Sequence, residues 1–132
     1  MQGIPGSGKS TAAKMLYPPA KIFSTDEFWG EDYDYDPARA GFAHRWNQER
    51  VRWAMLQGYR TIVVDNTNLT RDAMRPYEKL ATLFGYRLSV YRIDTPLEVC
   101  LERNRQRPPH RMIPEEVIRE MHAKLEAFNE SV

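Results

Sequence analysis

The feature that most constrains this chain is a phosphate-binding loop at its start. Residues 3–10 have the sequence GIPGSGKS, which matches the pattern G-x-x-x-x-G-K-[ST] at every position. Glycines let backbone N–H groups surround phosphate oxygens, and the helix that follows offers its positive N-terminal end. Lys9 is expected to reach the β- and γ-phosphates, and the Ser10 hydroxyl to ligate Mg²⁺. The expected nucleotide contacts here are Gly3, Pro5, Gly6, Ser7, Gly8, Lys9, Ser10 and Thr11.

The strand that normally leads into such a loop is short in this sequence. Only Met1 and Gln2 precede Gly3, whereas P-loop folds place a buried apolar strand there. The neighbours of that strand are expected to be the segments 60–65 and 86–93. We therefore expect the first strand to be missing or truncated in the printed sequence, with an additional strand ahead of Met1.

Apolar segments and helical patterns alternate along the rest of the chain. The run RTIVVD at 60–65 is the clearest strand, because consecutive apolar residues are typical of a strand covered on both faces. The predicted order is helix 8–16 closed by Pro18 and Pro19, strand 21–24, loop 30–37, a helix from the Asp36 cap to Gln57, strand 60–65, helix 71–84, strand 86–93, helix 96–106 capped by Thr95, and a last helix opened by Pro114. This alternation predicts one α/β domain, residues 1–132, with a parallel sheet between two layers of helices.

Composition and charge say less about the partners and location of the protein than its motifs say about its function. The net charge of +1 neither requires nor excludes nucleic acid, because the clustering of charge decides that. The single cysteine, Cys100, excludes an internal disulfide and fits a reducing compartment, with core packing as its expected role. The sequence has no signal-peptide pattern and no long apolar run, so we expect a cytoplasmic protein without a membrane partner.

Two acids follow predicted strands, at the edge where open α/β sheets bind ligands. Asp26 comes directly after the strand at 21–24 and is a candidate to accept a proton from an attacking hydroxyl. The equal alternative is that Asp26 caps a short helix at 27–29. Asp65 ends the buried strand, where P-loop enzymes hold the acid that steadies Mg²⁺ and its waters. For Asp65 the alternative is a turn-forming role.

A cluster of arginines begins at the end of the predicted helix 96–106. The segment RNRQRPPHR at 103–111 carries Arg103, Arg105, Arg107 and Arg111 without an acid among them. A solvated helix face is the usual explanation of such charge. Because this segment crosses from a helix into a proline-containing loop, its arginines can also fold over bound phosphates as a lid. Arg103 and Arg107 are therefore candidate nucleotide contacts.

Taken together, these motifs resemble the kinase module of phage 5′-hydroxyl polynucleotide kinases. The matching features are GIPGSGKST, Asp26-Glu27-Phe28 after a strand, Thr67-Asn68 after the next strand, RNRQR, and Pro114 followed by a helix that contains Met121. The middle of the chain is also similar to P-loop kinase domains of animal proteins in the same superfamily. There the matching residues are Ala43-His44-Arg45-Trp46-Asn47, Asp65-Asn66-Thr67-Asn68 and Pro76-Tyr77. The matches span nearly the whole chain.

The resemblance implies a role for individual residues. Lys9 and Ser10 would contact phosphates and metal, Asp26 would be the general base toward the 5′-hydroxyl, and Arg107 would be the lid arginine. Asn68 is implied at the substrate. Trp29 is also a candidate substrate contact, and it is a departure from the phage enzymes, which carry at this position an arginine that grips the substrate's phosphate.

The sequence departs from the phage pattern after the strand at 60–65. Phage enzymes have Asp-Thr-Asn there, so Asn66 falls where their acid stands, whereas the animal relatives keep Asp-Asn-Thr-Asn. We therefore expect Asp65 to be the acid, and the role of Asn66 stays open. The loop at 31–36 combines acids, which would repel a phosphate backbone, with tyrosines that can stack on bases or pack on the neighbouring helix.

The leading hypothesis is an ATP- and Mg²⁺-dependent kinase for the 5′-hydroxyl of DNA or RNA. One alternative is a P-loop kinase for a small-molecule hydroxyl, such as a nucleoside or sugar, since the same parts serve any hydroxyl. The other is a nucleotide-binding module without phosphoryl transfer. The sequence does not indicate an oligomeric state.

Overall fold

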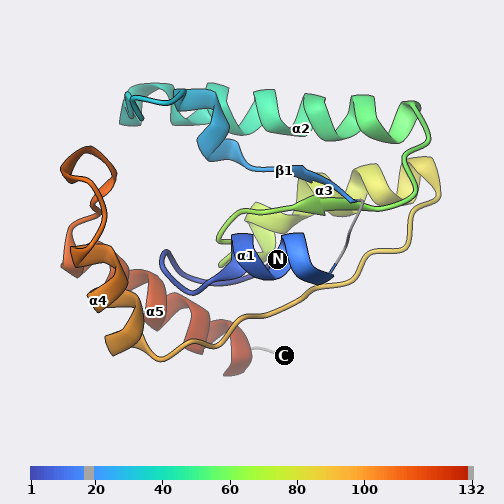
Figure 1. The fold of residues 1–132 in the computed structure, drawn as a ribbon. Coiled ribbons are helices and arrows are strands. Elements are labelled where there is room, and N and C mark those ends of the chain that lie inside the picture. Colours follow the sequence, from blue (N-terminus) through green and yellow to red (C-terminus); the bar gives the residue numbers. More distant parts are fainter. Residues whose placement is uncertain (17–19, 131–132) are drawn as a thin grey trace.

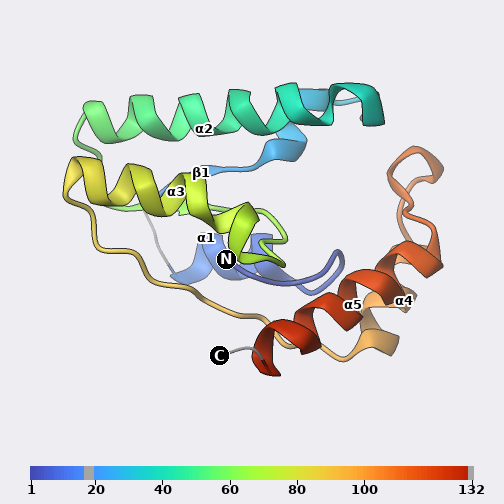
Figure 2. The same ribbon diagram turned by 180° about the vertical axis from the view of Figure 1, so that it is seen from behind.

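The computed structural model describes residues 1–16 and 20–130, and it is an α/β fold built on a short parallel sheet (Figures 1 and 2). The elements in chain order are α1 (Lys9–Leu16), β1 (Lys21–Phe23), the 3-10 helices η1 (Thr25–Trp29) and η2 (Pro37–Arg39), α2 (Ala40–Leu56), β2 (Ile62–Val64), α3 (Arg71–Phe84), α4 (Leu97–Arg105), the 3-10 helix η3 (Pro109–Arg111) and α5 (Glu115–Glu130). The expected stop of the first helix at Pro18 and Pro19 lies outside the described residues. No helix in the described ranges is long and apolar enough to cross a membrane.

The sheet is covered on both faces, as the continuous apolar run of β2 predicts. β1 and β2 pair in parallel, with Phe23 opposite Val64. Phe23 and Val64 pack against α2 and α3 in one apolar cluster, whereas Val63 and Ile22 pack with α1 in another. Alternate residues of each strand therefore bury their side chains in opposite layers, which confirms the predicted three-layer arrangement.

A third apolar cluster holds α4 and α5 beneath the phosphate-binding loop. Ile4 of that loop packs with Leu101 of α4 and with Ile118 of α5, and each is at most 1% exposed. Cys100 is buried in the same cluster, as predicted. In Figure 1, α4 and α5 lie side by side below the first loop, and the loop between them rises toward the N-terminal end of α2. This cluster positions the arginine-bearing segment over the loop.

Local sequence signals place most helix ends correctly. The Asp36 carboxylate accepts a hydrogen bond from the Ala38 N–H at 3.0 Å, and Pro37 follows it as predicted. α2 ends just before Gly58 (φ 78°) and α3 just before Gly85 (φ 75°). Both glycines adopt the left-handed conformation that ends helices at low steric cost.

The predicted strand at 86–93 is wrong, because this segment forms only an isolated bridge between Gln2 and Arg92. The segment runs extended from α3 to α4 (Figure 1), but it lies apart from β2 across a groove of about 260 Å³. Leu88 and Val90, which line this groove, are 49% and 50% exposed. A strand needs a hydrogen-bonded neighbour, and over most of its length this segment has none in the described chain.

The first residues of the chain occupy one end of that groove. The Met1 amino group donates to the Val64 carbonyl at 3.0 Å, and the Gln2 N–H donates to the Tyr91 carbonyl at 2.7 Å. Residues 1–3 thus bridge β2 and the extended segment in the manner of a strand end. The groove continues this line in the N-terminal direction, between residues 60–64 and 86–91.

Candidate active site

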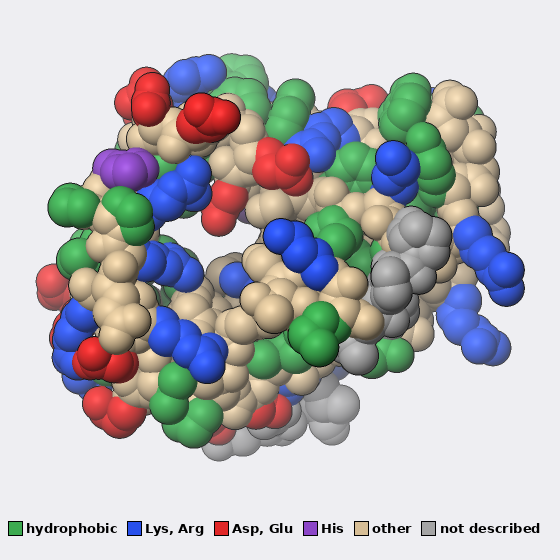
Figure 3. All heavy atoms as spheres, viewed as in Figure 1, with side chains coloured by type: hydrophobic (Ala, Val, Ile, Leu, Met, Phe, Trp, Pro, Cys, Tyr) green, Lys and Arg blue, Asp and Glu red, His purple; other side chains and the backbone are tan. Residues whose placement is uncertain are grey.

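Seven of the predicted site residues line one cleft of about 880 Å³. The phosphate-binding loop, the start of α1, η1, the residues after β2 and the loop between α4 and α5 all contribute to its walls. Figure 3 shows the opening, with Lys and Arg side chains along part of its edge and acidic side chains on the opposite rim. Lining residues that were predicted from the sequence are Pro5, Lys9, Ser10, Asp26, Trp29, Asp65 and Arg107.

The phosphate-binding loop has the conformation that its glycines predict. Gly6 and Gly8 have φ angles of 81° and 93°. A Cβ atom on Gly6 would lie 2.9 Å from the Cys100 carbonyl, so a larger residue is excluded by both backbone conformation and space. α4 therefore packs directly against the loop.

Two further contacts brace the loop. The Thr95 hydroxyl donates to the Ser7 carbonyl at 2.6 Å, and Arg103 donates to the Gly6 carbonyl at 3.0 Å. The prediction that Thr95 caps α4 is therefore wrong, since Pro96 occupies the cap position without a side-chain bond. Both side chains bind loop carbonyls and so do not compete with an anion for the loop N–H groups. Two of those N–H groups, of Gly3 and Ser7, donate to the carbonyls of Thr67 and Ile4.

Lys9 lies in the cleft close to acids and to the lid. Burial lowers the pKa of its ammonium, while the charges of Asp65 and Asp26 oppose that shift and Arg107 reinforces it. A cation that has lost much of its water gains most from an anion placed beside it. This environment is the one expected for a lysine that binds phosphate.

Ser10 and Asp65 form a candidate magnesium site. The Ser10 hydroxyl donates to Asp65 Oδ2 at 2.6 Å, and Asp65 is only 6% exposed. Among the described residues, the second carboxylate oxygen of Asp65 is buried and has no hydrogen-bond partner. Hard oxygen donors of this kind suit Mg²⁺, which typically takes one or two protein ligands besides phosphates and water. The described residues contain no cluster of three His, Cys, Asp or Glu side chains that could bind a metal alone.

Asn66, whose role the sequence leaves open, has a different position from Asp65. Its side-chain oxygen accepts a hydrogen bond from the Thr25 N–H at 2.9 Å. Asn66 thus ties the residues after β2 to the start of η1. Asp65 therefore lies beside Ser10, whereas Asn66 binds the segment that carries Asp26.

Asp26 projects from η1 into the cleft and does not cap the helix. Ser24 is the N-cap, and Glu27 completes a reciprocal capping box with it. Arg50 of α2 donates to Glu27 at 3.2 Å and holds the helix from behind. Because Ser24 and Glu27 satisfy the helix terminus, the exposed carboxylate of Asp26 is available for chemistry.

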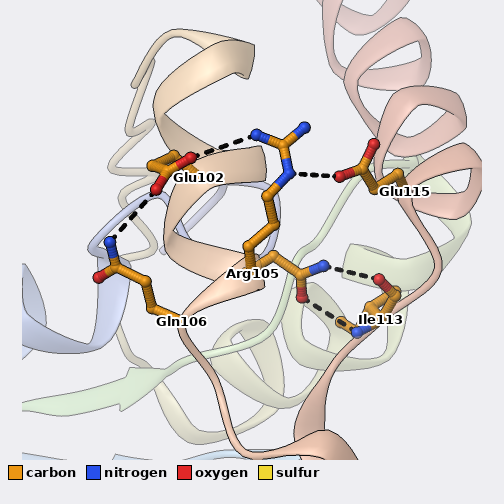
Figure 4. A network of polar contacts seen from close by, with 6 residues as sticks. Glu102, Arg105, Gln106, Ile113 and Glu115 are labelled. Carbon is orange, nitrogen blue, oxygen red and sulfur yellow. Dashed lines mark hydrogen bonds and ion pairs between the residues drawn. The ribbon is translucent and has the colours of Figure 1, made fainter.

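The four arginines of the predicted lid point in different directions. Arg107 lines the cleft and is half-buried, and Arg103 reaches the phosphate-binding loop. Arg105 instead donates to Glu115 at 2.7 Å and to Glu102 at 3.2 Å, both away from the cleft (Figure 4). Arg111 also lines the cleft. The sequence alone could not separate these roles, because all four arginines lie in one short run.

Asn104 fastens the base of the lid and was not predicted. Its side-chain amide donates to the Ile113 carbonyl at 2.7 Å and accepts from the Ile113 N–H at 3.0 Å (Figure 4). Asn104 is 1% exposed. This reciprocal pair closes the loop of residues 105–112 at its two ends, so Arg107 and Arg111 project from a pinned loop.

The two residues expected at the substrate have different surroundings. Trp29 lines the cleft but is 7% exposed, with its ring 5.0 Å from the rings of both Phe28 and Tyr35. Asn68 is buried outside the cleft lining and donates to the Met1 carbonyl at 2.7 Å. The position of Asn68 gives it a structural role at the end of the groove beside β2.

Comparison with known proteins identifies the family. A family model described as "AAA domain" matches residues 1–128. The chain belongs to this AAA-domain family. Human NEDD4-binding protein 2 is 37% identical over 100 residues, which cover 72% of this chain. A putative bifunctional polynucleotide kinase/RNA ligase of Autographa californica nuclear polyhedrosis virus is 27% identical over 143 aligned positions, which cover 96% of this chain.

These matches confirm the expected P-loop kinase-like family, with a polynucleotide kinase homologue and an animal relative. The AAA-domain chain spans 6% of the length of the human relative and 20% of the viral one. The rest of each relative therefore has no counterpart in the sequence described.

Proposed function

We propose that this AAA-domain protein transfers the γ-phosphoryl group of ATP to the 5′-hydroxyl of a polynucleotide. The observation that carries the proposal is the meeting of four elements in one cleft. These are the phosphate-binding loop with Lys9, the Ser10–Asp65 pair, the exposed carboxylate of Asp26, and Arg107 on the pinned lid. Transfer requires a phosphate cradle, an acid near the metal, a group for the acceptor hydroxyl, and positive charge on the moving group.

The donor side of the cleft would hold the triphosphate. Loop N–H groups, the N-terminus of α1 and the Lys9 ammonium supply the positive field. Ser10 and Asp65 would hold Mg²⁺, which when bound neutralises charge on the phosphate oxygens. Arg107 faces the same space from the lid and would stabilise negative charge that develops in the transition state.

The acceptor side of the cleft is defined by Asp26. Its carboxylate would accept the proton of the attacking hydroxyl as the oxygen–phosphorus bond forms and the bond to the leaving ADP oxygen breaks. In this arrangement Lys9 and Arg107 act on the phosphoryl group, whereas Asp26 acts on the nucleophile.

The identity of the acceptor rests on two kinds of support. The viral relative is named as a putative polynucleotide kinase/RNA ligase. The wall near Asp26 is aromatic, with Trp29, Tyr33 and Tyr35 lining the cleft, and flat rings suit nucleobases. The acids of the loop at 31–36 are the feature that favours a small acceptor instead, because they would repel a long phosphate backbone.

The direct test is a transfer assay with γ-labelled ATP, Mg²⁺ and oligonucleotides that end in a 5′-hydroxyl. We expect label on the 5′ end, and none on oligonucleotides that already carry a 5′-phosphate. Nucleosides and sugars tested in parallel distinguish the small-molecule alternative. A folded sample that binds ATP and labels none of these acceptors would support the nucleotide-binding module and reject the proposal.

Replacing Arg107 with alanine should lower kcat by about 10- to 100-fold, because a cation on the transferring group acts mainly in the transition state. The Kd for ATP should change by less than about threefold, as the loop and Lys9 remain. The matched control is Arg105→Ala, two residues earlier, whose side chain pairs with Glu102 and Glu115. An equal loss of ATP binding and turnover in Arg107→Ala would instead assign Arg107 to ground-state binding.

A further inference from the structure

Tyr33 has an unusual backbone conformation beside the proposed general base. Its φ angle is 49°, and Asn68 is the other non-glycine residue in the described ranges with a positive φ. Bulky residues rarely adopt this conformation, which is strained for any side chain with a Cβ atom. Hydrogen bonds from the Tyr33 N–H to Gly30 and from the Asp34 N–H to Trp29 hold the turn. The loop therefore maintains a strained tyrosine where a glycine or asparagine would fit more easily.

The strained backbone directs the Tyr33 side chain into the cleft. Its hydroxyl donates to Asp26 Oδ1 at 3.2 Å. The ring stacks on Tyr35, with centroids 6.3 Å apart and planes within 12°. Burial, reinforced by the charge and hydrogen bond of Asp26, raises the pKa of Tyr33 to about 12. The phenol thus keeps its proton near neutral pH and can act only as a donor toward the carboxylate.

The lid also reaches Tyr33. The guanidinium of Arg111 lies 5.3 Å from the centre of the Tyr33 ring, and it donates to the Glu31 carbonyl at 3.2 Å. The loop that carries Arg107 and the loop that carries Tyr33 therefore touch across the cleft. These two contacts of Arg111 join the donor and acceptor sides, and the contact with the ring holds Tyr33 from a second direction.

We propose that Tyr33 is a positioning residue that orients the Asp26 carboxylate toward the acceptor hydroxyl. The phenol engages Oδ1, and Oδ2 is then the oxygen that accepts the acceptor's proton. A short exposed side chain such as that of Asp26 otherwise samples several rotamers, and a hydrogen bond to a charged group restricts them. This inference rests on the proposed kinase function, because it concerns the residue that orients the general base of that kinase.

The test compares Tyr33→Phe with Tyr86→Phe in the full chain. Tyr33→Phe removes the hydroxyl but keeps the ring, its stacking and its contact with Arg111. Tyr86→Phe is the matched control, because it removes a phenolic hydrogen bond to the Tyr59 carbonyl, away from the cleft. We expect about a tenfold lower kcat for Tyr33→Phe, a KM for ATP within about twofold of wild type, and a kcat of Tyr86→Phe close to wild type.

A double-mutant cycle with Asp26→Asn separates positioning from a general structural role. If Tyr33 acts through Asp26, Tyr33→Phe should change the residual rate of Asp26→Asn by less than about twofold. The same tenfold loss in both backgrounds would overturn the inference, as would a wild-type rate for Tyr33→Phe.

Nuclear magnetic resonance of tyrosine labelled at ¹³Cζ supplies a readout independent of activity. Asp26→Asn should shift the Tyr33 resonance and leave that of Tyr86 in place, and an unchanged Tyr33 resonance would also overturn the inference. Failure of wild-type protein to phosphorylate any 5′-hydroxyl end rejects the proposed function instead. The spectra then still decide whether Tyr33 engages Asp26.

Discussion

Asp26→Asn should lower phosphoryl transfer to a 5′-hydroxyl by about 10³-fold, with ATP binding unchanged within about threefold. A positioned general base contributes roughly 10²- to 10⁴-fold, and the amide cannot accept the acceptor's proton. The substitution keeps the size of the side chain, and Ser24 and Glu27 hold η1 without help from the Asp26 carboxylate. The loss should therefore appear in kcat, measured with saturating ATP and oligonucleotide.

The control for this prediction is Asp34→Asn, in the acidic loop that follows η1. Asp34 is exposed and does not line the cleft, so removal of its charge tests whether acidity near the cleft is sufficient to explain the effect. We expect near wild-type turnover for Asp34→Asn. Full activity of Asp26→Asn would show that another group accepts the proton, and parallel losses in both variants would indicate a general electrostatic effect.

The parts of this molecule that depend on local sequence were predictable. Glycines that end helices, the cap at Asp36 and the phosphate-binding loop are set by the conformations of a few adjacent residues, and the structure contains each of them. The apolar run of β2 likewise predicted burial on both faces. Short-range steric rules are sufficient for such features.

Features that depend on distant partners were not predictable in this way. Thr95 has the local signature of a helix cap, yet it binds the phosphate-binding loop 88 positions away in the sequence. Asn104 lies in the RNRQR motif, but its role as the fastening of the lid comes from the position of Ile113 beside α4. Tyr33 could be identified as an aromatic residue near the site. Its hydrogen bond to Asp26, however, depends on a backbone turn with a positive φ angle that the sequence does not indicate. The segment 86–93 shows the same dependence, because its apolar pattern favours a strand that only a paired neighbour can stabilise.

Joining five β-branched apolar residues to the N-terminus of Met1 should stabilise the folded state by about 3 kcal/mol. The added segment would enter the 260 Å³ groove and continue the line of residues 1–3, parallel to β2. There it would pair with backbone groups of residues 60–64 and 86–91 and bury side chains against Val51, Met55 and Tyr77. Burial of the five side chains, at about 2 kcal/mol each, and several hydrogen bonds, at about 1 kcal/mol each, outweigh the ordering of the segment by a few kcal/mol.

The extension also removes a local cost. Burial lowers the pKa of the Met1 amino group, so the charged form of this group is less stable at the end of the groove than in water. A peptide bond at this position replaces that charge with a neutral N–H that can still donate to the Val64 carbonyl. We expect the unfolding midpoint to rise by about 10 °C for a chain of this size.

The matched control is a five-residue extension of alternating serine and glycine, which removes the same terminal charge but has no side chains to bury. Its midpoint should rise by at most a few degrees. Hydrogen exchange then locates the effect: amides of residues 61–64 and 87–91 should gain protection with the apolar extension and not with the control. Equal midpoints for the two extensions would mean that the groove does not accept a strand. Greater stability without new protection at these amides would place the added residues elsewhere on the surface.

The apolar extension should also strengthen ATP binding. Residues 1–3 lead directly into the phosphate-binding loop, so a strand in the groove should anchor that loop. Calorimetry on the same pair of proteins measures this effect.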